Sequence, residues 1–202
     1  MQFKPSFWLI NFLFVFFCLS ICLPKTAFSQ ETQIFVNEAD LFLQAQEHYD
    51  MGNYALAQQK FVDFLQSTAH NEKQDAHTKR MTAHFHEAMC AYKLGHPNVE
   101  LLFVNFLANY DDGGYYRNMA HYYVGQMYFA KRKYRDAIAA FKEVNADYLS
   151  ETQYAEFYFE MAYSHFTSKK FREAKKMFAK IINTYNQYYF DANYYYGILS
   201  FF

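Results

Sequence analysis

The pentapeptide FVDFL at residues 61–65 returns as FVNFL at residues 103–107. Two later stretches place a phenylalanine at the corresponding point, Phe141 in AIAAFKEV and Phe178 in AKKMFAKI. The phenylalanines at 61, 103, 141 and 178 follow one another at steps of 42, 38 and 37 residues, a period typical of repeat proteins. We therefore expect one structural unit to recur along the chain, with each copy burying the same apolar face.

A second series of positions has nearly the same period. Small residues recur with steps of 43, 37, 37 and 35, at Ala45, Ala88, Gly125, Ala162 and Gly197. Apolar residues also stand four positions before and three positions after each phenylalanine of the first series. They are Ala57, Val99, Ala137 and Ala174 before it, and Phe64, Phe106, Val144 and Ile181 after it. Spacings of three and four place them on one face of an α-helix.

The pattern predicts an all-α fold of four antiparallel helix pairs followed by the start of a fifth. The predicted helices are 38–51 with 54–66, 73–94 with 97–109, 116–131 with 134–146, 152–168 with 171–184, and a last one from Asp191. We expect Gly52 and Gly95 to supply the left-handed residue that ends a helix. Pro97 suits the first turn of the helix that follows, where its missing N–H costs nothing.

Three stretches carry a resemblance to the tetratricopeptide repeat family: AQEHYDMGNYALAQQKF from Ala45, GQMYFAKRKYRDAIAAF from Gly125 and AYSHFTSKKFREAKKMF from Ala162. The family has a small residue in the first helix, an aromatic after the turn, and an alanine and a large apolar residue in the second helix. The resemblance implies a right-handed superhelical solenoid whose first helices line a concave, partner-binding face. The second unit departs from the family pattern, because Pro97 and Val99 replace the aromatic and the alanine.

The first 29 residues resemble an export signal. Lys4 precedes an apolar run from Phe7 to Leu23, Pro24 breaks the run, and small residues precede a cut after Ser29. We therefore expect residues 30–202 to form the helical repeat domain, exported to the periplasm or associated with the outer membrane. An uncleaved membrane anchor is the alternative. A lipid anchor at Cys22 is less favoured, because lipoprotein signals have a small residue where Ile21 stands.

Removal of the predicted signal leaves 17 basic against 20 acidic residues, a formal charge of about −3. This balance argues against a nucleic-acid binder. Cys90 becomes the only cysteine, so no disulfide can form within the mature chain. The fold therefore depends on its core.

Aromatic residues stand three positions before and four positions after each small residue of the first helices. The residue one position past each small residue would face the groove between these aromatics. We predict a partner-binding surface, named here the first-helix surface, from eight residues at these three kinds of position: Phe85, Tyr92, Tyr122, Gln126, Phe129, Phe159, Tyr163 and Phe166. It would suit a peptide or a hydrophobic segment of a protein. The competing interpretation is that these rings pack between repeats, as aromatic residues at helical spacing usually do.

Two turns carry clustered positive charge. Lys131, Arg132 and Lys133 stand in one, and Lys169 and Lys170 stand at the same place in the next unit. They predict a basic rim along one edge of two adjacent units. Solvated helix ends would explain the rim, and contact with anionic lipid or an acidic partner is the alternative interpretation.

The sequence offers no catalytic residues, no cofactor site and no metal site. His86 and Cys90 lie four residues apart, but only two ligands would share that helix face. The glycines are scattered, so no phosphate-binding loop is present. We therefore expect a non-catalytic scaffold that binds a protein or peptide.

Two alternatives remain open. The stretch DANYYYGILSFF at residues 191–202 starts a fifth unit without its second helix, so we expect a protein that continues further. In that case the repeats would position a catalytic or sensor domain beyond residue 202. A purely architectural oligomer that associates through the last helix is the third possibility.

Overall fold

The computed structural model describes residues 38–70 and 74–201, and all regular structure within these ranges is helical. The predicted all-α class is confirmed for this part of the chain. The elements are α2 (Glu38–Asp50), α3 (Tyr54–Ser67), α4 (Gln74–Leu94), α5 (Val99–Asn109), α6 (Gly114–Ala130), α7 (Tyr134–Phe141), the 3-10 helix η1 (Ala146–Tyr148), α8 (Glu151–Thr167), α9 (Phe171–Phe178) and α10 (Tyr189–Leu199).

The predicted export signal, residues 1–29, lies outside the described residues. Among the helices of residues 38–70 and 74–201, none combines the length and the apolar character needed to cross a bilayer.

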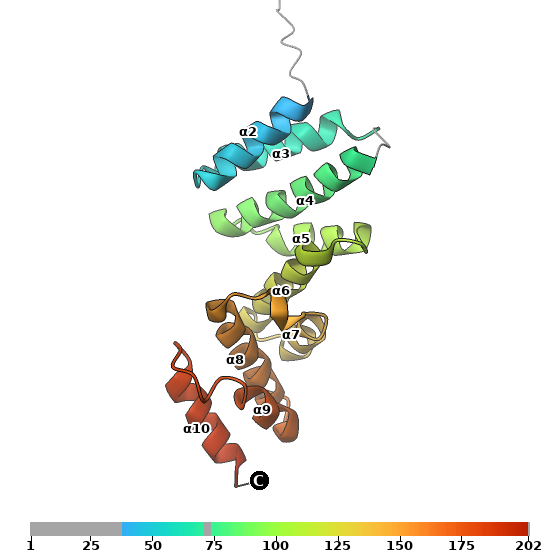
Figure 1. Cartoon of the computed structure of the whole chain (residues 1–202). Coiled ribbons are helices and arrows are strands. Elements are labelled where there is room, and N and C mark those ends of the chain that lie inside the picture. The colour runs from blue at the N-terminus through green and yellow to red at the C-terminus, as the bar shows by residue number, and fades with distance from the viewer. Residues whose placement is uncertain (1–37, 71–73, 202) are drawn as a thin grey trace, which may run out of the picture. The chain divides into compact units, whose positions relative to one another are not determined.

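Each helix packs against the next one along the chain, which gives the pairs α2/α3, α4/α5, α6/α7 and α8/α9 (Figure 1). We number these pairs units 1 to 4, and α10 follows unit 4. The first helices also contact one another from unit to unit, α2 with α4, α4 with α6 and α6 with α8. The predicted succession of helix pairs is therefore present in the described residues.

Four helix boundaries match the expected turn chemistry. After each first helix, one N–H donates to the carbonyl three residues back and the next N–H to the carbonyl five residues back, at distances of 2.8–3.2 Å. This is the Schellman motif, which needs a left-handed residue. That residue is Gly52 (φ 78°), Gly95 (φ 70°), Arg132 (φ 57°) and Lys169 (φ 60°) in units 1 to 4. The predicted left-handed role of the two glycines is confirmed.

Five predicted boundaries differ from the structure by two residues or more. Helices α6 and α10 each begin two residues earlier than predicted, at Gly114 and Tyr189. Pro97 lies in the turn before α5 rather than in its first turn, because the Schellman motif engages His96 and the helix begins only at Val99. The helix predicted to reach residue 146 ends at Phe141, and the Asn145 N–H donates to Asn118 Oδ1 at 2.6 Å. The helix predicted to reach residue 184 ends at Phe178.

The phenylalanines of the repeated pentapeptides lie in the core, as predicted, whereas Val104 between them is exposed. Phe61 and Phe64 of the first copy and Phe103 and Phe106 of the second are at most 2 % exposed. Phe141 and Phe178, the later members of the series, are equally buried. Each second helix thus presents the same bulky residue to its neighbours.

Successive units are joined by inserted rings. At three junctions, the side chain two positions before the small residue of a first helix is a ring that enters the preceding unit. There it meets the aromatic at the end of the first helix and the buried phenylalanine of the second. The ring centroids are 4.7 and 5.5 Å apart for His86 with Tyr49 and Phe61, 4.9 and 5.7 Å for Tyr123 with Tyr92 and Phe103, and 5.1 and 5.5 Å for Tyr195 with Phe166 and Phe178.

Gly125 and Gly197 occupy equivalent positions and allow a paired test. A Cβ at position 125 would lie within 2.9 Å of three ring atoms of Phe141, which packs against Phe157 and cannot move aside. We expect Gly125→Ala to destabilise the protein by about 1–3 kcal/mol through overpacking. A Cβ at position 197 meets nothing within 4 Å, so Gly197→Ala should stabilise helix α10 by about 0.5–1 kcal/mol. Urea unfolding followed by circular dichroism measures both, and equal effects would contradict the close packing of α6 on α7.

Candidate functional site

The first-helix surface divides into buried and partly exposed residues. Phe85 and Tyr122 belong to the core, with 5 % and 1 % of their surface exposed. The other six are half-buried: Tyr92, Gln126, Phe129, Phe159, Tyr163 and Phe166. These six present partly accessible side chains on α4, α6 and α8, whereas the first two serve packing.

Tyr163 of α8 lies at the centre of an aromatic cluster that spans three successive first helices. Its ring centroid is 5.9 Å from that of Phe129 on α6 and 5.5 Å from that of Tyr195 on α10. Within α8 it contacts Phe159 at 6.2 Å and Phe166 at 6.5 Å. We name these five rings the Tyr163 cluster. All five are half-buried, so each ring of the cluster is partly accessible.

Glu160 replaces the inserted ring at the junction of units 3 and 4. It stands two positions before Ala162, where the other junctions have His86, Tyr123 and Tyr195. The side chain is only 8 % exposed, and its Oε2 atom has no hydrogen-bond partner among the described residues. Burial and the nearby Glu156 carboxylate raise the pKa of Glu160 to about 8. The group is therefore largely protonated at neutral pH.

Tyrosines surround this pair of carboxylates. The Tyr122 hydroxyl donates to Glu156 Oε2 at 2.7 Å, across from α6 to α8. Burial, followed by the charges of Glu156 and Glu160, raises the pKa of Tyr92 and raises that of Tyr188 to about 12. These hydroxyls keep their protons at neutral pH and can donate to a carboxylate.

The sequence analysis did not single out Glu160. A signal was available, because aligning the units on their small residues puts His86, Tyr123, Glu160 and Tyr195 in one column. Glu160 is the one carboxylate in that column. Its burial could not be predicted, because it depends on side chains of the neighbouring unit.

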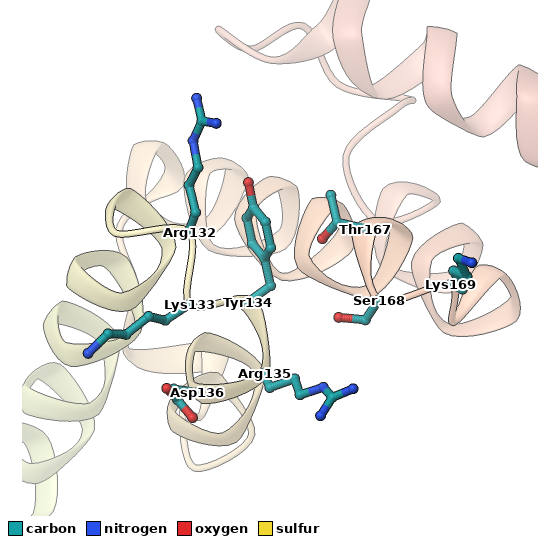
Figure 2. A pocket seen from close by; sticks show the side chains of 8 residues that line it. All are labelled: Arg132, Lys133, Tyr134, Arg135, Asp136, Thr167, Ser168 and Lys169. Atoms are coloured by element: carbon teal, nitrogen blue, oxygen red, sulfur yellow. The ribbon is translucent and has the colours of Figure 1, made fainter.

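The two basic turns come together at one open cleft of about 660 Å³ between units 3 and 4 (Figure 2). Arg132, Lys133 and Arg135 line it on one side and Lys169 on the other. Thr167, Ser168, Tyr134 and Asp136 complete the lining. We name this feature the basic cleft.

The remaining charges of the predicted basic rim have other surroundings. Lys131 forms an ion pair with Glu100 of α5, and this partner holds the pKa of Glu100 below its usual range. The Lys133 ammonium lies 5.6 Å from the centre of the Tyr128 ring, and in Figure 2 its side chain extends away from the Thr167–Lys169 turn. Lys170 is exposed and does not line the cleft.

The two residues considered as metal ligands, His86 and Cys90, have other surroundings in the structure. Within residues 38–70 and 74–201, no group of three or more His, Cys, Asp or Glu side chains gathers to hold a metal ion. His86 lies 2.8 Å from the Thr82 carbonyl through Nδ1 and stacks on Phe61. Burial raises the pKa of the Cys90 thiol to about 12, which suppresses the thiolate that would bind a metal.

A scan against protein-family models finds no match, and a search of curated proteins finds no significant one.

The buried carboxylate predicts a pH-dependent stability. The folded pKa of about 8 exceeds the ordinary value of 4.5. The contribution of Glu160 to the free energy of unfolding is therefore fully present below pH 4.5. It is lost as pH rises to 8, at up to about 1.4 kcal/mol per pH unit. Glu160→Gln has no proton to lose. The stability of this variant relative to wild type should therefore increase steadily from pH 5 to pH 8 and level off above that.

Urea unfolding at a series of pH values measures this difference. Glu151→Gln, at an exposed position of the same helix, is the matched control and should stay parallel to wild type. A Glu160→Gln curve that also runs parallel to wild type would show that the carboxyl is ionised in the folded protein.

Proposed function

We propose that this protein is a non-catalytic scaffold of the tetratricopeptide repeat type that binds a protein or peptide through its first-helix surface. The observation that carries the proposal is the Tyr163 cluster, five half-buried rings contributed by three successive first helices. The succession of helix pairs with repeated turn geometry supports the repeat type. A right-handed superhelix of four repeats and the start of a fifth follows from the resemblance.

The kind of partner follows from the chemistry of the cluster. Rings that are partly buried are already fixed in place by packing, so they lose little conformational freedom when a partner covers them. Aromatic side chains of this kind supply much of the binding energy in protein interfaces. Gln126, half-buried one position past Gly125 on α6, adds a side chain that can bond to the backbone of an extended peptide.

The place of action is proposed from the N-terminal sequence. An apolar run from Phe7 to Leu23 with small residues before a cut after Ser29 suits export, and the scaffold would then act in the periplasm or at the outer membrane. Export is independent of the binding surface, so each part of the proposal can fail without the other.

Site-specific crosslinking tests the binding surface. A photoreactive benzoylphenylalanine at Gln126 or Tyr163 should give a discrete adduct in cells that express the full chain. The same residue at Ala139, exposed on the second helix α7, is the control and should give none. Phe129→Ala should weaken partner binding about tenfold or more, as expected for an aromatic anchor, and should reduce the adduct at position 163 while helicity is retained.

The contradicting outcomes are specific. Adducts of equal yield from positions 126, 163 and 139 would indicate non-specific contact. Adducts from position 139 alone would place the partner on the second helices and refute the proposed surface.

A further inference from the structure

The basic cleft joins two turns that are equivalent in the repeat but differ from the turns of units 1 and 2. The left-handed residue is glycine in units 1 and 2, and Arg132 and Lys169 in units 3 and 4. A left-handed conformation is disfavoured for residues with a Cβ. Both cleft-forming units therefore hold a strained cationic residue where glycine would be relaxed.

The residue after each of these left-handed positions is also unusual for its place in the helix. It is Lys133 in unit 3 and Lys170 in unit 4, each at the N-cap of the following helix, where unit 1 has Asn53; none of the three side chains makes a capping hydrogen bond. A lysine cannot accept a hydrogen bond from the free N–H groups there, and its charge is repelled by the positive end of the helix dipole. Two unfavourable features, a left-handed cation and a lysine N-cap, thus occur together in each turn that forms the basic cleft. Such a combination indicates a functional role for these turns.

Three of the four cations that line the cleft are available to a ligand, whereas Lys133 lies over the Tyr128 ring. Arg132, Arg135 and Lys169 are exposed, and no ion pair joins any of them to an acid among the described residues. Lys131, one residue away, does pair with Glu100. Asp136 is the one acid that lines the cleft, so the charge balance there is strongly positive.

The arrangement favours an extended polyanion over a single small anion. In Figure 2 the ends of Arg132, Arg135 and Lys169 point in different directions instead of converging on one point. One phosphate would need convergent donors.

The aromatic residue Tyr134 in the cleft lining favours a polypeptide as the polyanion. Tyr134 lines the cleft, and its ring centroid is 5.9 Å from that of Phe129 and 6.0 Å from that of Tyr163. The cleft is therefore continuous with the Tyr163 cluster. A polypeptide can offer carboxylates to the cations and apolar side chains to the adjoining rings.

We propose that the basic cleft binds an extended acidic segment of a protein partner, whose carboxylates pair with Arg132, Arg135 and Lys169. The cleft lies beside the first-helix surface and not within it. The inference therefore goes beyond the proposed function and can fail while the crosslinks from Gln126 and Tyr163 persist.

The test uses the full 202-residue chain and a fluorescent decapeptide of alternating Glu and Ser, which contains no ring and so reports on the cleft alone. Fluorescence anisotropy at 50 mM NaCl gives the affinity. The Arg132→Gly/Lys169→Gly double variant should weaken binding about tenfold, as expected for two exposed charge pairs. Its thermal midpoint should equal or exceed that of wild type, because glycine relieves both left-handed residues.

Matched controls separate the cleft from general charge. Lys142→Gln/Lys176→Gln removes two positive charges at exposed positions outside the cleft lining and should change the affinity less than about twofold. Arg135→Gln should weaken binding without a rise in thermal midpoint, because Arg135 is not strained. Wild-type affinity should fall steeply with salt.

Several results would overturn the proposal. They are equal affinity of wild type and the Arg132→Gly/Lys169→Gly variant, equal affinity for a Gln-Ser decapeptide, and absence of binding at 50 mM NaCl. Displacement of the peptide by inorganic phosphate beyond the effect of equal ionic strength would indicate a single-anion site instead. Binding only to phosphatidylglycerol vesicles, lost in the double variant, would assign the cleft to a membrane surface.

Discussion

The insertion of a ring into the preceding unit, made by three of the helices α4, α6, α8 and α10, is the contact on which the arrangement of the described residues depends. A helix pair alone leaves the aromatic at the end of its first helix and the phenylalanine of its second helix partly uncovered. His86, Tyr123 and Tyr195 each close such a gap. An aromatic pair contributes about 0.5–1.5 kcal/mol beyond the area it buries. Stability is therefore distributed over the junctions between units, as in other repeat proteins.

The junction of units 3 and 4 obeys a different rule. Glu160 takes the place of the inserted ring, and other contacts hold the units together. Among them are the Tyr122 hydrogen bond to Glu156, the Phe141 ring against Phe157 at 5.4 Å, and the Phe129 ring against Tyr163 at 5.9 Å. A buried carboxyl with an unpaired oxygen costs stability that a ring would not. The cost falls at the junction that also bears the basic cleft and part of the Tyr163 cluster.

Much of the fold could be predicted from the sequence, because the repeat imposes the same demand on each unit. The burial of the periodic phenylalanines and the left-handed conformation of Gly52 and Gly95 follow from the sequence pattern of each unit, and both predictions are confirmed. The start of α5 at Val99 and the end of α7 at Phe141 were not predictable. They depend on a turn that engages His96 and on a hydrogen bond to Asn118 from a distant segment.

The candidate surfaces show the same limit. Phe85 and Tyr163 both entered the predicted surface on helical spacing alone, yet Phe85 is buried against its neighbours and Tyr163 is partly accessible. Exposure depends on which side chains the next unit brings. The basic turns were evident from composition, whereas the cleft between them exists only because two units place those turns opposite each other.

Tyr134 shows how the repeat itself would set the selectivity of a scaffold. The aromatic after the turn packs on the aromatic that ends the first helix in three units, as Tyr54 on Tyr49 at 5.5 Å, Tyr134 on Phe129 at 5.9 Å and Phe171 on Phe166 at 5.8 Å. Its position is therefore fixed by packing within the unit and not by a partner. Because Tyr134 borders both the basic cleft and the Tyr163 cluster, the separation between cations and rings is fixed as well. A partner of the proposed kind must then present an acidic group and an apolar group at a matching separation, and a chain with either group alone would bind more weakly.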